Sequence, residues 1–147
     1  MEQEKELTAM QKTQIYLDNY REMVRYAEEA VSEVSQVQDI TKYNISAEKA
    51  FLQSIRECRA ETIILLEHIN KALASLKEDA EAAGIGYKYD ALEAVYVKGK
   101  TYEDIVRDTG CGKNTPKKWC NLMKERLSIK LFGAKAIEKK TELNKTG

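Results

Sequence analysis

Residues that interrupt helices are scarce in this chain of 147 residues. There is one proline, Pro116, and the first of the seven glycines is Gly84. Proline and glycine are the two residues least compatible with a helix interior, so a first half without either favours long helices. Together with the spacing of the apolar residues described below, this composition predicts an all-α protein.

Metal-binding and nucleophilic residues are also few. The chain has three cysteines, Cys58, Cys111 and Cys120, and one histidine, His68. No two cysteines form a Cys-x-x-Cys pair, and His68 belongs to the other half of the chain from Cys111 and Cys120. Neither a zinc site nor a Cys–His nucleophile is therefore predicted. We expect no enzyme activity and no cofactor, and an odd number of unpaired cysteines suits the reducing cytoplasm.

Long apolar runs are missing from the sequence. No stretch reaches the length of a membrane span, and Met-Glu-Gln-Glu-Lys-Glu at the start is unlike a secretory signal. We therefore expect a cytoplasmic protein without membrane contact. Gly110-Cys-Gly-Lys113 does not predict a phosphate-binding loop, because Arg107 stands where that loop needs glycine and Asn114 where it needs Ser or Thr.

Acidic and basic residues are separated along the chain. The totals cancel at 24 each, but residues 1–84 hold 10 Lys/Arg and 16 Asp/Glu, whereas residues 85–147 hold 14 Lys/Arg and 8 Asp/Glu. The formal charges of the two parts are −6 and +6. This asymmetry predicts an acidic scaffold that carries a basic nucleic-acid-binding module. The acidic part is expected to point away from DNA or to contact another protein.

Apolar residues in the first half repeat at alternating spacings of three and four, and they form two series. The first is Met10, Thr13, Leu17, Tyr20, Val24, Ala27, Val31 and Val34, and the second is Phe51, Ile55, Cys58, Thr62, Leu65, Ile69, Ala72 and Leu76. Both are heptad patterns, separated by a break at 40–46. They predict a long antiparallel helical hairpin, or coiled coil, over residues 1–84.

The second predicted helix has a wider apolar face than packing against one other helix can bury. This surplus predicts packing on a further surface, and we favour a homodimer formed through the hairpin. A monomeric hairpin folded over its own C-terminal domain is the alternative. Gly84-Ile-Gly86 is predicted as the boundary of a domain over 85–133 that opens with a short helix from about Asp90 to Lys98. Residues 134–147 are predicted to form a polar basic tail.

Residues 98–127 have the pattern of a helix-turn-helix. Thr101 and Asp104 form a capping-box pair at the start of a first helix, and Gly110 can adopt the positive φ that ends it. Asn114 or Thr115 can cap a second helix over about 114–131. Within it, Pro116 fits the first turn, and four residues are spaced to pack inward: Trp119, Leu122, Met123 and Leu127.

The polar residues left over on the second helix form a cationic outer face. Lysines position DNA phosphates, and asparagine can bond to adenine or to phosphate, so this pattern predicts a recognition helix in the major groove of double-stranded DNA. The predicted DNA-contacting residues are Lys113, Asn114, Thr115, Lys117, Lys118, Asn121 and Lys124.

The C-terminal part, from Tyr89 to Leu131, resembles region 4 of bacterial sigma factors. That family combines an apolar helix, a Thr-x-x-Glu-Ile-Ala-type helix, a Gly-Cys-Ser-type turn and a Thr-Val-x-x-Trp-type recognition helix. The matching residues here are Leu92–Val97, Thr101-Tyr-Glu-Asp-Ile105-Val106, Gly110-Cys-Gly112 and Thr115-Pro-Lys-Lys-Trp119. With the helical hairpin in front, the whole chain looks like the small phage and prophage regulators of the ArpU and RinA type.

The resemblance implies a sequence-specific transcription regulator of late phage genes that binds promoter DNA and acts on RNA polymerase. It departs from the family pattern at three positions. Val106 replaces a small alanine, Gly112 replaces a serine cap, and Pro116 replaces an apolar β-branched residue and is expected to remove a packing contact.

Two other functions fit parts of the pattern. One is a protein-interaction module that binds RNA polymerase or a repressor and never binds DNA. The other is a phage DNA-packaging protein similar to a small terminase subunit, which also joins a helix-turn-helix to a helical oligomerisation part. A ring-sized assembly would favour the packaging protein, and partner binding that survives reversal of the Lys117 and Lys118 charges would favour the interaction module.

Overall fold

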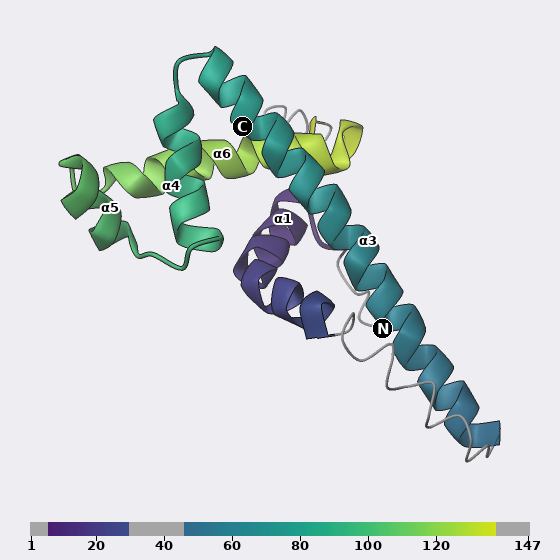
Figure 1. Ribbon diagram of the computed structural model, residues 1–147. Helices are drawn as coiled ribbons and strands as arrows, with labels where there is room; N and C mark the ends of the chain where they lie inside the picture. The colour runs from purple at the N-terminus through teal and green to yellow at the C-terminus, as the bar shows by residue number, and fades with distance from the viewer. Residues whose placement is uncertain (1–5, 30–45, 138–147) are drawn as a thin grey trace, which may run out of the picture.

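The computed structural model describes residues 6–29 and 46–137, and all regular structure in these two ranges is helical (Figure 1). The helices with defined bounds are α1 (Ala9–Asp18), α3 (Ser46–Ala82), α4 (Gly86–Tyr96), α5 (Tyr102–Thr109) and α6 (Thr115–Phe132). Residues 20–29 are also helical and are called the 20–29 helix below, and a short helical stretch covers 134–137. The prediction of an all-α protein is confirmed for the described residues.

The predicted first helix is interrupted at Asn19. The side-chain nitrogen of Asn19 donates a hydrogen bond to the carbonyl of Ile15 at 2.7 Å, and its backbone has φ −107° and ψ 7°. Asparagine side chains compete in this way for backbone groups that a helix would otherwise use. The apolar spacing continues across Asn19, which is why the sequence predicted one helix here. Val31 and Val34 of the same prediction lie outside the described residues.

The N-terminal helices have two different neighbours. α1 packs against α6, where the rings of Tyr16 and Phe132 stack with their centres 6.2 Å apart. The 20–29 helix lies against α3 instead: the Tyr20 hydroxyl donates to Asn70 at 2.6 Å, and the Arg59 guanidinium lies 5.9 Å from the centre of the Tyr26 ring. Residue numbers rise along one helix and fall along the other, so the two run antiparallel. The packing of α1 on α6 was not predicted.

The long helix α3 is buried over only part of its length. Its 37 residues span about 55 Å. Its first turns extend away from the other helices (Figure 1), and Phe51 and Ile64 are 67% and 55% exposed. Cys58, placed in the predicted seam, is also exposed. The buried residues of α3 all belong to its second half: Leu66, Ile69, Ala72, Leu73, Leu76 and Ala80.

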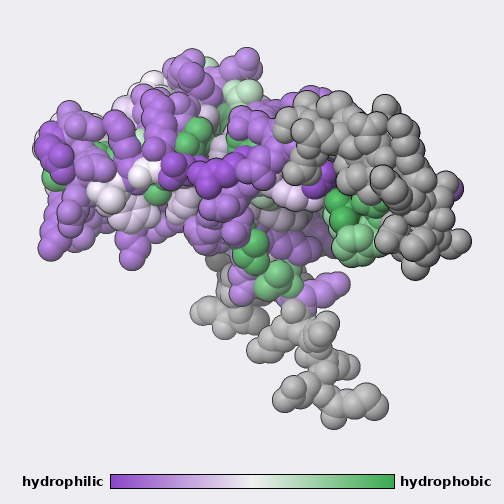
Figure 2. Space-filling view, turned by 60° about the horizontal axis from the view of Figure 1, so that its bottom comes forward, coloured by the Kyte–Doolittle hydropathy of each residue, from purple (hydrophilic) through white to green (hydrophobic). Residues whose placement is uncertain are grey.

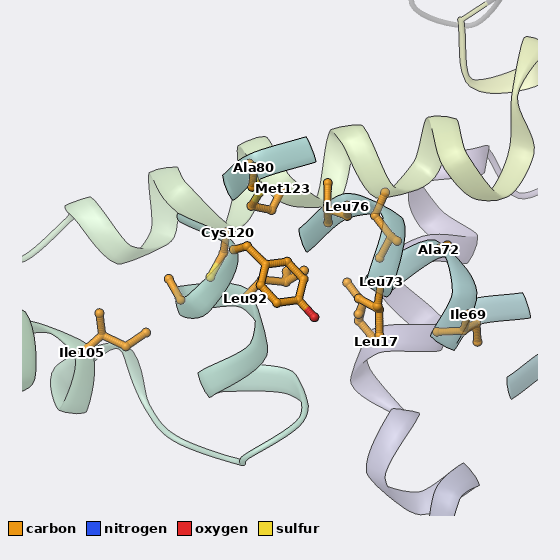
Figure 3. Packing of buried hydrophobic residues seen from close by; sticks show 13 residues of the cluster. Leu17, Ile69, Ala72, Leu73, Leu76, Ala80, Leu92, Ile105, Cys120 and Met123 are labelled. Carbon is orange, nitrogen blue, oxygen red and sulfur yellow. The ribbon is translucent and has the colours of Figure 1, made fainter. Parts of the chain in front are cut away.

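One hydrophobic core joins the N-terminal and C-terminal helices. Leu17 of α1, Leu76 of α3, Leu92 of α4, Ile105 of α5 and Met123 of α6 belong to the same cluster of buried side chains (Figure 3). The predicted boundary at Gly84 therefore marks a turn between two helices of a shared core, not a division between two cores. Sequence spacing correctly identified buried residues such as Thr13, Leu17, Ile69 and Leu76, but spacing alone cannot say which helix faces meet.

Helix α4 begins four residues earlier than predicted, at Gly86 instead of about Asp90. The additional turn is held by Tyr87, whose ring meets that of Trp119 edge-on with the centres 5.2 Å apart, and by Tyr89, which is buried. The helix ends at Tyr96. Gly99, predicted to stop it, follows in a left-handed conformation with φ 74°.

Candidate nucleic-acid interface

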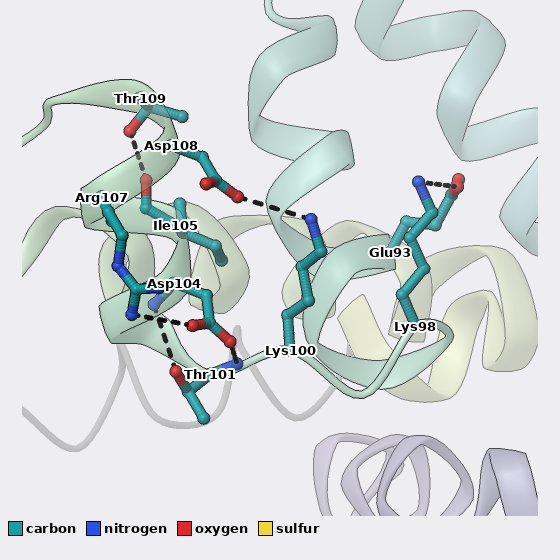
Figure 4. Close-up of polar contacts among 9 residues, drawn as sticks. All are labelled: Glu93, Lys98, Lys100, Thr101, Asp104, Ile105, Arg107, Asp108 and Thr109. Carbon is teal, nitrogen blue, oxygen red and sulfur yellow. Dashed lines mark hydrogen bonds and ion pairs between the residues drawn. The ribbon is translucent and has the colours of Figure 1, made fainter.

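The start of α5 is fixed by a reciprocal capping box. The Thr101 hydroxyl accepts a hydrogen bond from the backbone N–H of Asp104 at 3.1 Å, and the Asp104 carboxylate accepts one from the backbone N–H of Thr101 at 3.0 Å (Figure 4). This backbone hydrogen bond, with help from the Thr101 hydroxyl, Arg107 and Lys100, lowers the pKa of Asp104. The predicted capping pair is confirmed, and it sets where the first helix of the motif begins.

The turn between α5 and α6 is also the predicted one. Gly110 has φ 74°, and its backbone N–H bonds to the carbonyl of Val106 at 2.8 Å. Thr109 supports the turn, because its hydroxyl donates to the carbonyl of Ile105 at 2.7 Å and accepts from the N–H of Cys111 at 3.3 Å. Ile105 is buried, so this helix is tied to the core next to the turn.

The N-terminal end of α6 is fixed by packing more than by a side-chain cap. Asn114 occupies the cap position, but its side chain makes no capping hydrogen bond. Pro116 lies in the first turn and is fully buried, so the expectation that it removes a packing contact was wrong. Cys120, Met123 and Leu127 are fully buried behind it, whereas Trp119 and Leu122, also predicted to pack inward, are half-buried.

Most of the predicted DNA-contacting residues share an exposed face at the start of α6. Thr115 is half-buried, and five others are exposed: Lys113, Asn114, Lys117, Lys118 and Asn121. None of these three lysines is in an ion pair with a residue that the structure describes. Figure 2 shows a surface made mainly of hydrophilic residues at the end of the molecule that carries α5 and the start of α6. This face therefore offers unpaired cations and amide groups to a ligand.

Lys124, predicted with these residues as a DNA contact, does not belong to this face because it is buried. The residue is only 7% exposed, and its ammonium lies 5.0 Å from the centre of the Tyr96 ring on α4. The Tyr96 hydroxyl accepts a hydrogen bond from Gln14 of α1 at 3.3 Å, so three helices meet here. Helical spacing placed Lys124 on the row of Lys117 and Asn121, but α1 packs against α6 and the exposed row stops at Asn121.

Two cations of α6 outside the predicted set differ in their availability. Arg126 is exposed and follows Lys118 by eight residues, which places it on the same side of the helix about two turns further on. That spacing could have identified it from the sequence. Lys130 is occupied, because its ammonium lies 2.6 Å from the Asp79 carboxylate and 2.8 Å from the Ser75 hydroxyl of α3.

The buried cysteine of α6 is held in its protonated form. Burial raises the pKa of the Cys120 thiol to about 11. A thiol with that pKa is almost fully protonated at neutral pH and is a poor nucleophile or metal ligand. Burial likewise raises the pKa of Tyr102, which lies close to Cys120, to about 12. Both groups belong to the packing that supports α6.

The described residues contain no group of three or more His, Cys, Asp or Glu side chains arranged to hold a metal ion. Within the same residues, no helix is both long enough and apolar enough to cross a membrane. Comparison of the chain with protein-family models, with curated proteins and with solved structures found no match.

Proposed function

We propose that the chain is a sequence-specific DNA-binding regulator of transcription, of the phage and prophage type that its sequence resembles. One observation carries the proposal: the exposed lysines and asparagines at the start of α6 follow a capped helix and a left-handed glycine turn. A helix presented in this way can enter the major groove while the preceding helix crosses the DNA backbone.

The proposed roles follow from the chemistry of the side chains. Lys113, Lys117 and Lys118 contact phosphates, and Asn114 and Asn121 contact base edges or phosphates. The first two turns of α6 enter the groove, because the exposed row of Lys117 and Asn121 ends at the buried Lys124. Three phosphate contacts predict that log affinity falls with log salt concentration at a slope of about −2.7 for each bound chain.

In the proposed arrangement, α4, α5 and α6 form the helix-turn-helix domain, and the 20–29 helix and α3 belong to the N-terminal hairpin. The antiparallel contacts of Tyr20 with Asn70 and of Tyr26 with Arg59 support the hairpin. We further propose a cytoplasmic homodimer joined through α3, since Phe51 and Ile64 are exposed on it. A dimer would place two recognition helices on two half-sites.

The direct test is a gel-shift assay with DNA fragments from the genomic neighbourhood of the gene. The test variant is Lys117→Glu/Lys118→Glu, and the matched control is Lys71→Glu/Lys77→Glu, which reverses two exposed charges on α3. We expect a fragment-selective shift with the wild type and the control, and none with the test variant. A shift that survives in the test variant would contradict the proposed role of α6.

A protein-interaction function is the second candidate, and the exposed apolar residues of α3 favour it. On this view, α3 binds RNA polymerase or another regulator and α6 binds no DNA. A pull-down with purified RNA polymerase separates the two functions. Capture that is lost in Phe51→Ser/Ile64→Ser but kept in Lys117→Glu/Lys118→Glu, with no DNA shift by the wild type, would replace the DNA-binding proposal.

A further inference from the structure

Two arginines of the acidic N-terminal part lie beside the turn that leads into α5. Arg21 and Arg25 are four residues apart on the 20–29 helix, so they share one face of it. With Val97 at the end of α4, they line an open hollow of about 280 Å³. Figure 4 shows the N-terminal helical part of the chain beside the turn that carries Lys98 and Lys100.

The guanidinium of Arg21 lies close to the backbone of this turn. Gly99 has φ 74°, and a Cβ atom at residue 99 would collide with the guanidinium of Arg21. The guanidinium therefore lies directly over the backbone of Gly99, two residues before the capping residue Thr101. The turn and the arginine form one surface, although 78 positions separate them in the sequence.

The cations around the hollow outnumber the carboxylates that neutralise them. Arg21 and Arg25 form no ion pair with any residue in the described ranges. Lys98 lies 3.7 Å from the half-buried Glu93, and Lys100 lies 3.4 Å from Asp108 in an exposed pair. Exposed pairs of this kind contribute little stability and exchange readily for another anion. Glu28 is the one carboxylate among the residues that line the hollow.

We propose that Arg21 and Arg25, assisted by Lys98 and Lys100, bind two neighbouring phosphate groups of the DNA backbone beside the turn that leads into α5. This inference rests on the proposed DNA-binding function and extends its contact surface to the N-terminal part. Guanidinium groups suit phosphate because they donate two parallel hydrogen bonds to its oxygens. In helix-turn-helix complexes the first helix of the motif crosses the backbone. The hollow lies beside the turn that leads from α4 into that helix.

The position of Arg21 and Arg25 is opposite to what the net charge of the N-terminal part suggests. The N-terminal part, with a formal charge of −6, was expected to point away from DNA. The 20–29 helix instead presents its two arginines at the turn before α5, and the net charge of a segment does not describe the face that it presents. Two added phosphate contacts would change the predicted salt slope from about −2.7 to about −4.5.

The test compares the salt dependence of DNA binding in the full-length chain. The test variant is Arg21→Gln/Arg25→Gln, and Lys71→Gln/Lys77→Gln removes the same charge from exposed positions on α3. We expect the slope of the test variant to be shallower by about 1.8 and its affinity at 0.15 M salt to be about ten- to thirtyfold weaker. The control should match the wild type, and Glu28→Gln should bind more tightly than the wild type.

The experiment distinguishes failure of the proposed arginine contacts from failure of the proposed DNA-binding function. Equal slopes in the test variant, the control and the wild type, with binding still lost in Lys117→Glu/Lys118→Glu, would overturn this inference and leave the proposed function intact. A wild type that binds no DNA at low salt would overturn both. Circular dichroism of each variant verifies that it is folded, as expected for substitutions at exposed positions.

Discussion

The ammonium of Lys124 on α6 lies 5.0 Å from the centre of the Tyr96 ring on α4. This lysine is therefore a packing residue, while Lys117 and Lys118, about two turns earlier on the same helix, remain exposed. The contact joins the proposed recognition helix to the rest of the core, because Tyr96 is also bonded to Gln14 of α1.

Lys124 and Lys118 should respond to substitution in opposite ways. Lys124→Gln should lower the free energy of unfolding by about 1–2 kcal/mol, through loss of the cation–ring contact and of its packed alkyl stem, and leave the salt slope of DNA binding unchanged. Lys118→Gln should make that slope shallower by about 0.9 and change stability by less than about 0.5 kcal/mol. Urea denaturation and binding titrations measure the two quantities. A shallower slope for Lys124→Gln would mean that its ammonium reaches DNA.

Gly99 and Gly110 form a matched pair for testing the contact with Arg21. Both have φ 74°, but a Cβ atom meets the Arg21 guanidinium at Gly99 and nothing within 4 Å at Gly110. Gly110→Ala should cost about 1–2 kcal/mol, the usual penalty of a left-handed conformation for a residue with a side chain. Gly99→Ala should cost more than Gly110→Ala by thermal or chemical denaturation. The added Arg21→Ala substitution should remove the excess, and equal losses in the two single variants would mean that Arg21 moves aside freely.

The buried and half-buried residues of α6 should differ in their contribution to stability. Met123→Ala should lower the free energy of unfolding by about 2–5 kcal/mol, because Met123 is fully buried. Trp119→Ala should cost less than the 3–5 kcal/mol typical of a fully buried aromatic, because the ring lies at the surface against Tyr87, which is itself 50% exposed. Chemical denaturation of the two variants provides the comparison. A greater loss for Trp119→Ala would place the centre of the core nearer the start of α6.

The raised pKa of Cys120 predicts lower stability at alkaline pH. In the unfolded chain the thiol ionises near its ordinary pKa of 9.0, whereas in the folded protein it keeps its proton until about pH 11. Its contribution is therefore fully present below pH 9 and is lost as the pH rises from 9 to 11, by about 2 kcal/mol. Unfolding followed by denaturant between pH 8 and 11 measures the loss. Cys120→Ala should show a smaller decrease over this range, and an identical decrease would assign the effect to other groups such as Tyr102.

The features that the sequence predicted correctly are local ones. The capping pair of Thr101 and Asp104, the positive φ of Gly110 and the position of Pro116 each depend on residues within one turn of helix, so spacing is sufficient to find them. The two ends of α6 were likewise predicted to within one residue, at 114–131 against the observed Thr115–Phe132.

The features that were missed depend on contacts between distant segments. The sequence identifies the apolar face of α1 but not that this face packs on α6, and so it could not show that Lys124 is buried. The spacing of four places Arg21 and Arg25 on one face of a helix, but it does not show that Arg21 lies beside Gly99 or that Arg25 lies near Val97. The net charge of a segment, moreover, includes residues on all of its faces, so it does not give the charge of the one face that another molecule would contact.

The hydrophobic cluster that continues from α3 across the turn at Gly84 into α4 and α6 limits how this protein can be modified. In many regulators the DNA-reading part is a module that can be cut out and fused to another protein. Here the same cut would remove Leu17, Ile69 and Leu76 from behind Met123 and Leu127 and leave an apolar face open to water. The proposed DNA contacts are therefore better altered by substitution on the exposed face of α6 than by transfer of residues 85–133 to a new carrier.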